Sequence, residues 1–254
     1  MLVNSQRIAV REKLILAGLY FSKYDLAGVR RLGFGSFLEA FNVIGYALGA
    51  KPATVKNYRD EFDPLFPNRR KGWHKRATRD YCLKVFRQYG GLDLEAFSGL
   101  VRSFVGYDEN AWSEVRPEDE NGDGESSFAK RLITGLAAEH YFESVQPRLP
   151  EFKDFALENT TRLGCGYDFR LRSEAHDDFL AIEVKGLKER TGTLAFTPKE
   201  HEVAAALNNR FFLFVVKNFA ESPFHEIYQD PLAGSLQFKK KERVLVHISW
   251  LASV

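Results

Sequence analysis

The chain has 254 residues, of which 44% are hydrophobic and 14% aromatic, enough for a packed core in one or two globular domains. Charged residues near the start and the absence of any long apolar run argue against a signal peptide and a membrane span, so we expect no membrane partner and an intracellular, cytoplasmic protein. A prokaryotic origin is a separate expectation. Cys82 and Cys165 lie far apart with no ligand-type neighbours, which favours reduced thiols over a zinc site or a disulfide framework.

Charge is distributed unevenly along the chain. Residues 1–106 hold 18 Lys or Arg against 9 Asp or Glu, residues 107–127 hold 1 against 8, and the remainder is balanced at 17 against 17. A basic front part followed by a neutral back part suggests that the first binds a polyanion and the second acts on it. A merely solvated basic surface is the alternative.

Hydrophobic periodicity divides the chain into three parts. Apolar residues recur at helical spacing in residues 11–21, 36–49, 53–66 and 79–90, which predicts a mostly helical, basic domain over residues 1–106. Residues 107–127 are acidic and rich in turn formers, as in a linker. Over residues 128–254 the pattern predicts a helix, several strands, a second helix and further strands, the last in residues 243–251, so the fold class is α/β or α+β.

The stretch over residues 44–62 resembles a helix-turn-helix, with a turn near Gly49 and Pro52 and with Val55 facing inward. The side chains expected to face outward, toward the edges of DNA bases, are Thr54, Lys56, Asn57 and Arg59. An ordinary helical hairpin is the alternative.

A basic loop follows over residues 68–76, where cations surround Trp73. Cations beside an exposed aromatic ring suit a phosphate backbone or an unstacked base. The residues expected to bind DNA here are Arg69, Arg70, Lys71, Trp73, Lys75 and Arg76.

Two alternating runs, residues 166–171 and 180–185, predict a hairpin whose tip lies between Ala175 and His176. Residues whose numbers sum to 351 then pair across the strands, so Asp168 opposes Glu183. Because directly opposed like charges repel, something positive is expected between them. By the same alternation Glu183 and Lys185 project together, away from the packed side. Two carboxylates with a nearby ammonium describe a divalent-metal site for phosphate chemistry, and an ordinary charged hairpin face is the alternative.

A third acid lies on the helix predicted over residues 128–143. Glu139 falls near the middle of the apolar arc that includes Phe128, Ala129, Ile133, Leu136 and Phe142. A charged Glu rarely stays buried without a partner, so we expect Glu139 to reach the same site as the hairpin acids. A surface glutamate on a helix of different register is the alternative.

Four motifs now stand in order: GLAAE, GYD, IEVKG and FTPKEHEVAAAL, within residues 128–220. This set resembles the C-terminal domain named after the plant protein NO VEIN, a branch of the PD-(D/E)xK nuclease superfamily. The resemblance implies a restriction-endonuclease-like mixed central sheet flanked by helices, with Asp168, Glu183 and Lys185 as the catalytic triplet and Glu139 beside it. It implies Mg²⁺, with Mn²⁺ as a substitute, bound by Asp168, Glu183, Glu139 and the Val184 carbonyl. The branch has GYD where the superfamily has a proline before the acid.

The segment before the last helix carries further expectations. Thr197, Pro198 and Glu200 form a capping box, so a structural role is expected for Glu200 rather than a catalytic one. Lys199, in a first turn where the helix dipole disfavours cations, is expected to approach a phosphate of DNA. Because acids flank Lys185, its pKa is expected to be raised, so it suits orienting water and stabilising charge better than acting as a free base.

The sequence therefore predicts a Mg²⁺-dependent DNA endonuclease of the restriction or defence kind, which reads double-stranded DNA, with or without modified bases, through residues 1–106. A homodimer is the economical route to a double-strand break. Two other functions stay open: a catalytically inactive DNA-binding regulatory protein that keeps the nuclease fold, and a repair or RNA nuclease of low sequence specificity.

Overall fold

The computed structural model describes residues 8–70, 72–73, 75–104, 124–173, 176–234 and 236–242. The α-helices are α1 (Val10–Arg31), α2 (Phe37–Ala47), α3 (Pro52–Phe62), α4 (Asp80–Tyr89), α5 (Leu94–Ser103), α6 (Gly124–Val145) and α7 (Pro198–Leu207). The strands are β1 (Ala156–Asn159), β2 (Phe169–Ser173), β3 (His176–Gly186), β4 (Phe211–Lys217) and β5 (Phe224–Gln229). A helical N-terminal part followed by a mixed sheet with helices confirms the expected α+β class.

Within the described ranges the sheet has five strands in the order β1-β2-β3-β4-β5. Neighbours are antiparallel except for β3 and β4, which run parallel and are connected through α7. The apolar run from Phe211 to Val216 is buried throughout, which confirms the prediction of a central buried strand. The strand predicted over residues 243–251 lies outside the described residues, as does the predicted linker as far as residue 123, and α6 begins at Gly124.

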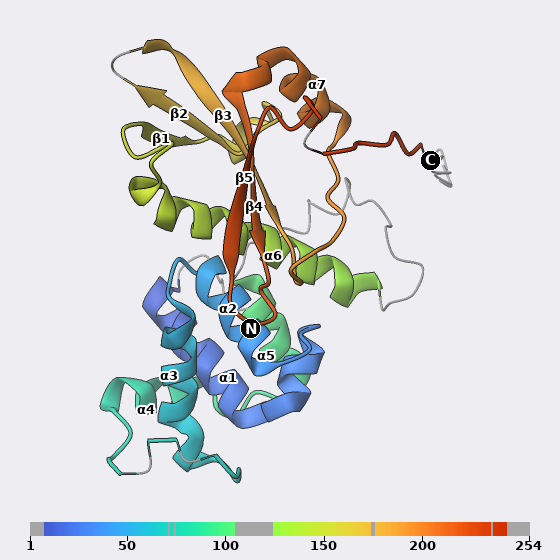
Figure 1. The fold of residues 1–254 in the computed structure, drawn as a ribbon. Helices are drawn as coiled ribbons and strands as arrows, with labels where there is room; N and C mark the ends of the chain where they lie inside the picture. Colours follow the sequence, from blue (N-terminus) through green and yellow to red (C-terminus); the bar gives the residue numbers. More distant parts are fainter. Residues whose placement is uncertain are drawn as a thin grey trace, which may run out of the picture.

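Helices cover both faces of the sheet (Figure 1). On one face α6 crosses β3 and β4, and Phe142 of α6 packs against Phe169 and Phe214 with ring centroids 5.1 and 4.8 Å away. On the other face Ala204 of α7 packs with Ala181 and Phe211. A Cβ added at Gly186 would lie 2.9 Å from the backbone oxygen of Thr134, so only glycine allows α6 to cross β3 so closely.

The N-terminal helices pack against α6 from the side away from the sheet, chiefly through α2 (Figure 1). Ser36 caps α2 by accepting a hydrogen bond from the Glu39 N–H, and the buried Glu39 forms an ion pair of 2.6 Å with Lys130 of α6. His140 Nδ1 of α6 lies 3.1 Å from the Tyr46 carbonyl oxygen. One hydrophobic core therefore extends from α1 through α6 to the sheet.

The helices expected around residues 44–62 are present as α2 and α3. They are joined by a short turn in which Gly49 has a φ of 67°, and Val55 is buried as predicted. The turn geometry suits a helix-turn-helix and an ordinary helical hairpin equally, so its role in DNA binding stays a prediction. Helix α5, capped by Asp93, was not among the predicted helical stretches. Cys82 is buried, Cys165 is half-buried, and both thiols are free.

Within the described ranges no helix is long and apolar enough to cross a lipid bilayer.

Asn42 provides a test of how firmly the two parts are joined. Its buried amide donates to the carbonyl oxygens of Phe219 and Glu221, both at 2.9 Å, in the turn between β4 and β5. We expect Asn42→Ala to lower the free energy of unfolding by about 1–3 kcal/mol, because the buried Phe219 carbonyl and the partly buried Glu221 carbonyl lose their donor. Urea denaturation measures the change, with the exposed Asn57→Ala as control. Equal stability of the two variants would contradict the assigned role of Asn42.

Candidate active site

The hairpin of β2 and β3 has the predicted register. Phe169 pairs with Ile182, and the pairs continue with numbers that sum to 351 as far as Arg172 and Phe179. The register shifts only at the bulge between Arg172 and Ser173, near the tip. The carboxyl-bearing end of the hairpin therefore has the alignment that the alternation of side chains predicted.

Asp168 lies immediately before β2 and is fixed to β3 by both its backbone and its side chain. Its N–H donates to the Ile182 carbonyl oxygen at 3.0 Å, and its Oδ2 accepts a hydrogen bond of 2.8 Å from the Val184 N–H. The carboxylate of Asp168 is thus held beside Glu183, the neighbour of Val184 on β3.

Glu183 is buried, with only 3% of its surface exposed. The prediction that Glu183 and Lys185 face away from the packed side is therefore wrong. Alternation along β3 separates the two faces correctly, but both faces are packed, because parallel β3 and β4 require a crossover element and α7 covers the second face.

Lys185 pairs with Glu183 and with Glu200, and its charge also acts on Asp168, although no direct contact joins Lys185 to Asp168. Its Nζ lies 2.5 Å from Glu183 Oε1 and 2.9 Å from Glu200 Oε2. Glu200 also completes the capping box of α7, since its carboxylate accepts from the Thr197 N–H while its own N–H donates to Thr197 Oγ1. The predicted cap is confirmed. The contact of Glu200 with Lys185 was missed, because a cap motif does not indicate which strand the carboxylate will meet.

Burial and mutual repulsion raise the pKa values of the acids in this group. Burial is the main cause of raising the pKa of Asp168 to about 6, and the Val184 N–H and Lys185 oppose it. Burial and then the charge of Asp168 raise the pKa of Glu183 well above its usual value. Burial alone would lower the pKa of Lys185, but Glu183 and Glu200 outweigh it and raise that pKa, as predicted.

Glu139 of α6 belongs to the same electrostatic group. It is half-buried, among the buried Ala137, Ala138 and Phe142 of its helix. Burial first and then the charges of Asp168 and Glu143 raise the pKa of Glu139 to about 8, whereas Lys185 opposes the rise. The side chains of Phe128 and Ala129, which the predicted apolar arc included, lie outside the described part.

The group has the donor chemistry of a site for a hard divalent cation. Asp168, Glu183 and Glu139 supply carboxylate oxygens, the ligands that Mg²⁺ and Mn²⁺ prefer, and a bound cation would relieve the repulsion that raises their pKa values. As they stand, no three His, Cys, Asp or Glu side chains in the described ranges converge closely enough to hold a metal ion. The carboxylate of Glu183 is engaged by Lys185, so binding would require that ion pair to open.

The residues predicted to bind DNA through α3 differ in their exposure. Lys56 and Asn57 are exposed and Thr54 is half-buried. Arg59 does not face outward as predicted, since its side chain is only 11% exposed. Its guanidinium lies over the rings of Phe37 and Phe41, because α3 packs against α2, which carries both rings, and it also pairs with Asp60 at 2.6 Å.

The basic loop also divides into inward and outward cations. Arg70 pairs with Asp63 at 2.7 Å and Arg76 pairs with Glu61, and both carboxylates are buried. Trp73 is 39% exposed with the Arg76 guanidinium 4.6 Å from its ring centroid. Arg69, Lys75 and Lys199 are exposed, the last in the first turn of α7. Lys71 lies outside the described residues.

Comparison with known families bears on the second half of the chain. Residues 139–229 match the family model described as Protein NO VEIN, C-terminal. The match begins at Glu139 and ends with the last residue of β5, so it includes Asp168, Glu183 and Lys185. Comparison with curated proteins and with solved structures gave no match. The expected resemblance to the NO VEIN C-terminal domain is confirmed. The matched residues include the candidate site but not the N-terminal helices.

The raised pKa values predict how the metal-free protein responds to pH. Folded Asp168 and Glu139 keep protons up to about pH 6 and 8, whereas the unfolded chain loses them near pH 4. The folded state therefore binds more protons in this window, and its stability falls as pH rises through it. In EDTA, we expect lower stability at about pH 8.5 than at about pH 6.

The variant Glu139→Gln isolates the contribution of one group. It removes the charge at nearly constant shape, so at about pH 8.5 we expect it to be more stable than the wild type by about 1 kcal/mol or more, since one pKa unit corresponds to roughly 1.4 kcal/mol. Thermal or urea unfolding measures this, and the exposed Glu202→Gln serves as control. A gain no larger than that of the control would show that Glu139 does not share the field of Asp168.

Proposed function

We propose that the protein is a Mg²⁺-dependent DNA endonuclease whose C-terminal part hydrolyses phosphodiester bonds. The observation that carries the proposal is the site itself: Asp168 fixed at 2.8 Å to the Val184 N–H, beside buried Glu183 and next to Lys185. Burying neighbouring carboxylates is unfavourable unless a cation compensates them. Residues 139–229 match the NO VEIN C-terminal model, and the resemblance of the sequence motifs to the PD-(D/E)xK nucleases, which stays an expectation, supports the same assignment.

Each residue has a role in this proposal. Asp168, Glu183 and the Val184 carbonyl would hold Mg²⁺ or Mn²⁺, and Glu139 would hold a bound water or a second ion. Such an ion lowers the pKa of its water and neutralises charge on the scissile phosphate. Lys185 keeps its proton, because its raised pKa rules out a free amine near neutral pH, and its ammonium is suited to orienting the attacking water and stabilising the charge that develops on the phosphate.

The N-terminal part is proposed to bind double-stranded DNA. The exposed candidates are Lys56, Asn57, Arg69, Trp73 and Lys75. Arg59, Arg70 and Arg76 pair with acids of their own chain and are only 11%, 20% and 33% exposed, so they are proposed to support these side chains rather than to meet DNA. Lys56 also pairs with an acid, Asp60, at 2.6 Å, but its side chain is 53% exposed and it stays a candidate. Restriction or defence is the proposed setting, and a homodimer would allow both strands to be cut.

A second function is favoured by one observation. Lys185 bonds to Glu183, and the described acids do not converge on a metal position. A DNA-binding regulatory protein that keeps the fold without turnover would have the same features. A nuclease of low sequence specificity, acting in repair or on RNA, differs from the first proposal only in its substrate.

Asp168→Asn separates catalysis from folding. The amide oxygen can still accept from the Val184 N–H, so the variant should fold, but it loses the charge needed to bind a cation. We expect cleavage of mixed plasmid and genomic DNA, methylated and unmethylated, with Mg²⁺ to fall by about 100-fold or more. Asp178→Asn, at an exposed position of β3, is the matched control. Binding of DNA without cleavage by the wild type under every condition would favour the regulatory function.

The loop cations can be tested by the salt dependence of DNA binding. Removing one cation that binds a phosphate is expected to reduce the slope of log affinity against log salt concentration by about one. We expect this for Arg69→Ala and for Lys75→Ala, and no change for Arg190→Ala, whose side chain is 71% exposed in the other part of the chain. Unchanged slopes for both loop variants would remove the loop from the DNA-binding surface.

A further inference from the structure

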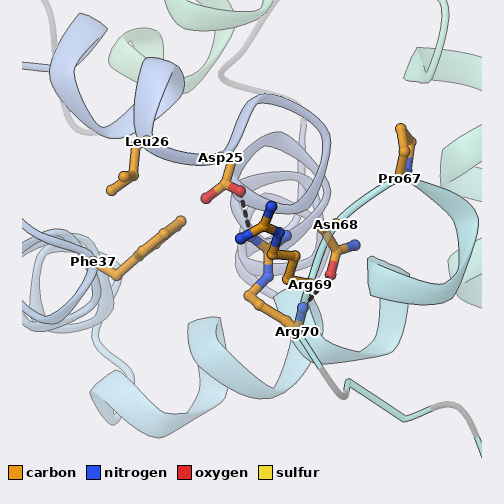
Figure 2. A pocket seen from close by; sticks show the side chains of 7 residues that line it. All are labelled: Asp25, Leu26, Phe37, Pro67, Asn68, Arg69 and Arg70. Carbon is orange, nitrogen blue, oxygen red and sulfur yellow. Dashed lines mark hydrogen bonds and ion pairs between the residues drawn. The ribbon is translucent and has the colours of Figure 1, made fainter.

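A hollow of about 600 Å³ lies in the N-terminal part, between α1, the start of α2 and the loop that follows α3. Its lining residues are Asp25, Leu26, Phe37, Pro67, Asn68, Arg69 and Arg70. In Figure 2, Leu26 and Phe37 lie on one side, Pro67 on the other, and Asp25 meets Arg70 between them. The hollow is open to solvent, so a ligand in it would be only partly enclosed. We call it the Asp25 pocket.

Asp25 interrupts α1 with a backbone conformation that is rare outside glycine. Its φ is 51° and its ψ is −137°, inside an otherwise helical stretch. Such strained positions cluster at binding and active sites, where the surrounding structure holds them. The side chain of Asp25 is 49% exposed, and one oxygen lies 2.8 Å from Arg70 Nη1, which leaves carboxylate surface open to a ligand.

The polar floor of the pocket is held rigidly. Arg70 bonds to the fully buried Asp63 at 2.7 Å, and Ser22 Oγ donates to the same carboxylate at 2.8 Å. The Asn68 amide donates to the Asp63 and Phe66 carbonyl oxygens, and its Oδ1 accepts from the Arg70 N–H at 2.9 Å. The charge of Arg70 is thereby compensated within the protein, and the hydrogen-bonding groups of Asn68 are largely engaged.

The walls of the pocket are partly apolar and aromatic. Leu26 is 47% exposed and Phe37 is half-buried. The guanidinium of Arg70 lies 5.7 Å from the Phe37 ring centroid. Arg69 and Pro67 are exposed at the rim. Apolar and aromatic walls around a few fixed polar groups are typical of sites for heterocyclic ligands.

We propose that the Asp25 pocket binds an unstacked nucleobase that bears an exocyclic amino group, with Arg69 on the neighbouring phosphate. The carboxylate of Asp25 accepts from an amino group, as acidic side chains do from cytosine N4. The same carboxylate disfavours a bare phosphate in the pocket, and thymine offers no amino donor. Pro67 directly precedes the basic loop of residues 68–76, which lines the pocket with its first residues and also carries Trp73 and Lys75. A DNA strand that enters the pocket would therefore follow these cations. The proposal rests on DNA being the substrate.

The experiment measures binding of three fluorescein-labelled single-stranded 12-mers by anisotropy at low salt. One is all dT, the second has a single central dC, and the third has a central abasic site. We expect the dC strand to bind at least about fivefold more tightly than either of the others, the discrimination typical of one specific hydrogen bond with stacking.

Two variants test whether the preference for dC arises in the Asp25 pocket. Asp25→Asn tolerates the positive φ and offers both a donor and an acceptor, so the preference for dC over dT should disappear while binding persists. Leu26→Ala should weaken binding of the dC strand and leave the abasic strand unchanged. Leu163→Ala, which removes a leucine that is 66% exposed in the C-terminal part, is the control and should change neither.

Plasmid cleavage with Mg²⁺ by the same preparations distinguishes this proposal from the nuclease function. Three results would overturn the proposed base binding by the Asp25 pocket: equal binding of the three strands, binding of none, or a dC preference that Asp25→Asn does not change. If the protein still cleaves plasmid DNA in that case, the nuclease proposal stands. A dC preference that depends on Asp25 in a protein that never cleaves supports the pocket and overturns the nuclease.

Discussion

The ammonium of Lys185 is the contact on which the second half of the structure depends. It joins Glu183 on β3 to Glu200 at the first turn of α7, on a sheet face that α7 covers. Without a cation, Glu183 and Asp168 would repel each other in surroundings too dry to screen them. The same lysine therefore fixes the start of the crossover helix and balances the acids, and an incoming divalent cation would have to compete with it for Glu183.

The N-terminal part also has buried acids that are compensated by cations, and there the cations are arginines. The buried acids Glu61 and Asp63, at the end of α3 and just after it, hold Arg76 and Arg70. These pairs tie the loop after α3 to the helices, because breaking one would leave a buried carboxylate uncompensated. A basic composition thus contains two populations: cations that organise the loop, and cations such as Arg69 and Lys75 that stay exposed.

Local patterns in the sequence predicted the features that depend on neighbours in the chain. The register of Asp168 against Glu183 follows from strand alternation and a short tip, and the cap of α7 follows from Thr197 and Glu200. Features that depend on distant packing were not predictable. The burial of Glu183 requires knowing that α7 covers that face, and the inward position of Arg59 requires the rings of α2. Helix α5 is short, and a glycine interrupts its apolar pattern.

The members of the carboxylate and lysine group all come from one uninterrupted stretch, from Glu139 to Glu200. Adjacent residues of α6 have different partners. Burial and the charge of Asp168 raise the pKa of Glu139, whereas His140 contacts Tyr46 of α2. Because both residues belong to one helix, a displacement of α6 at its contact with α2 would also move Glu139 relative to Asp168.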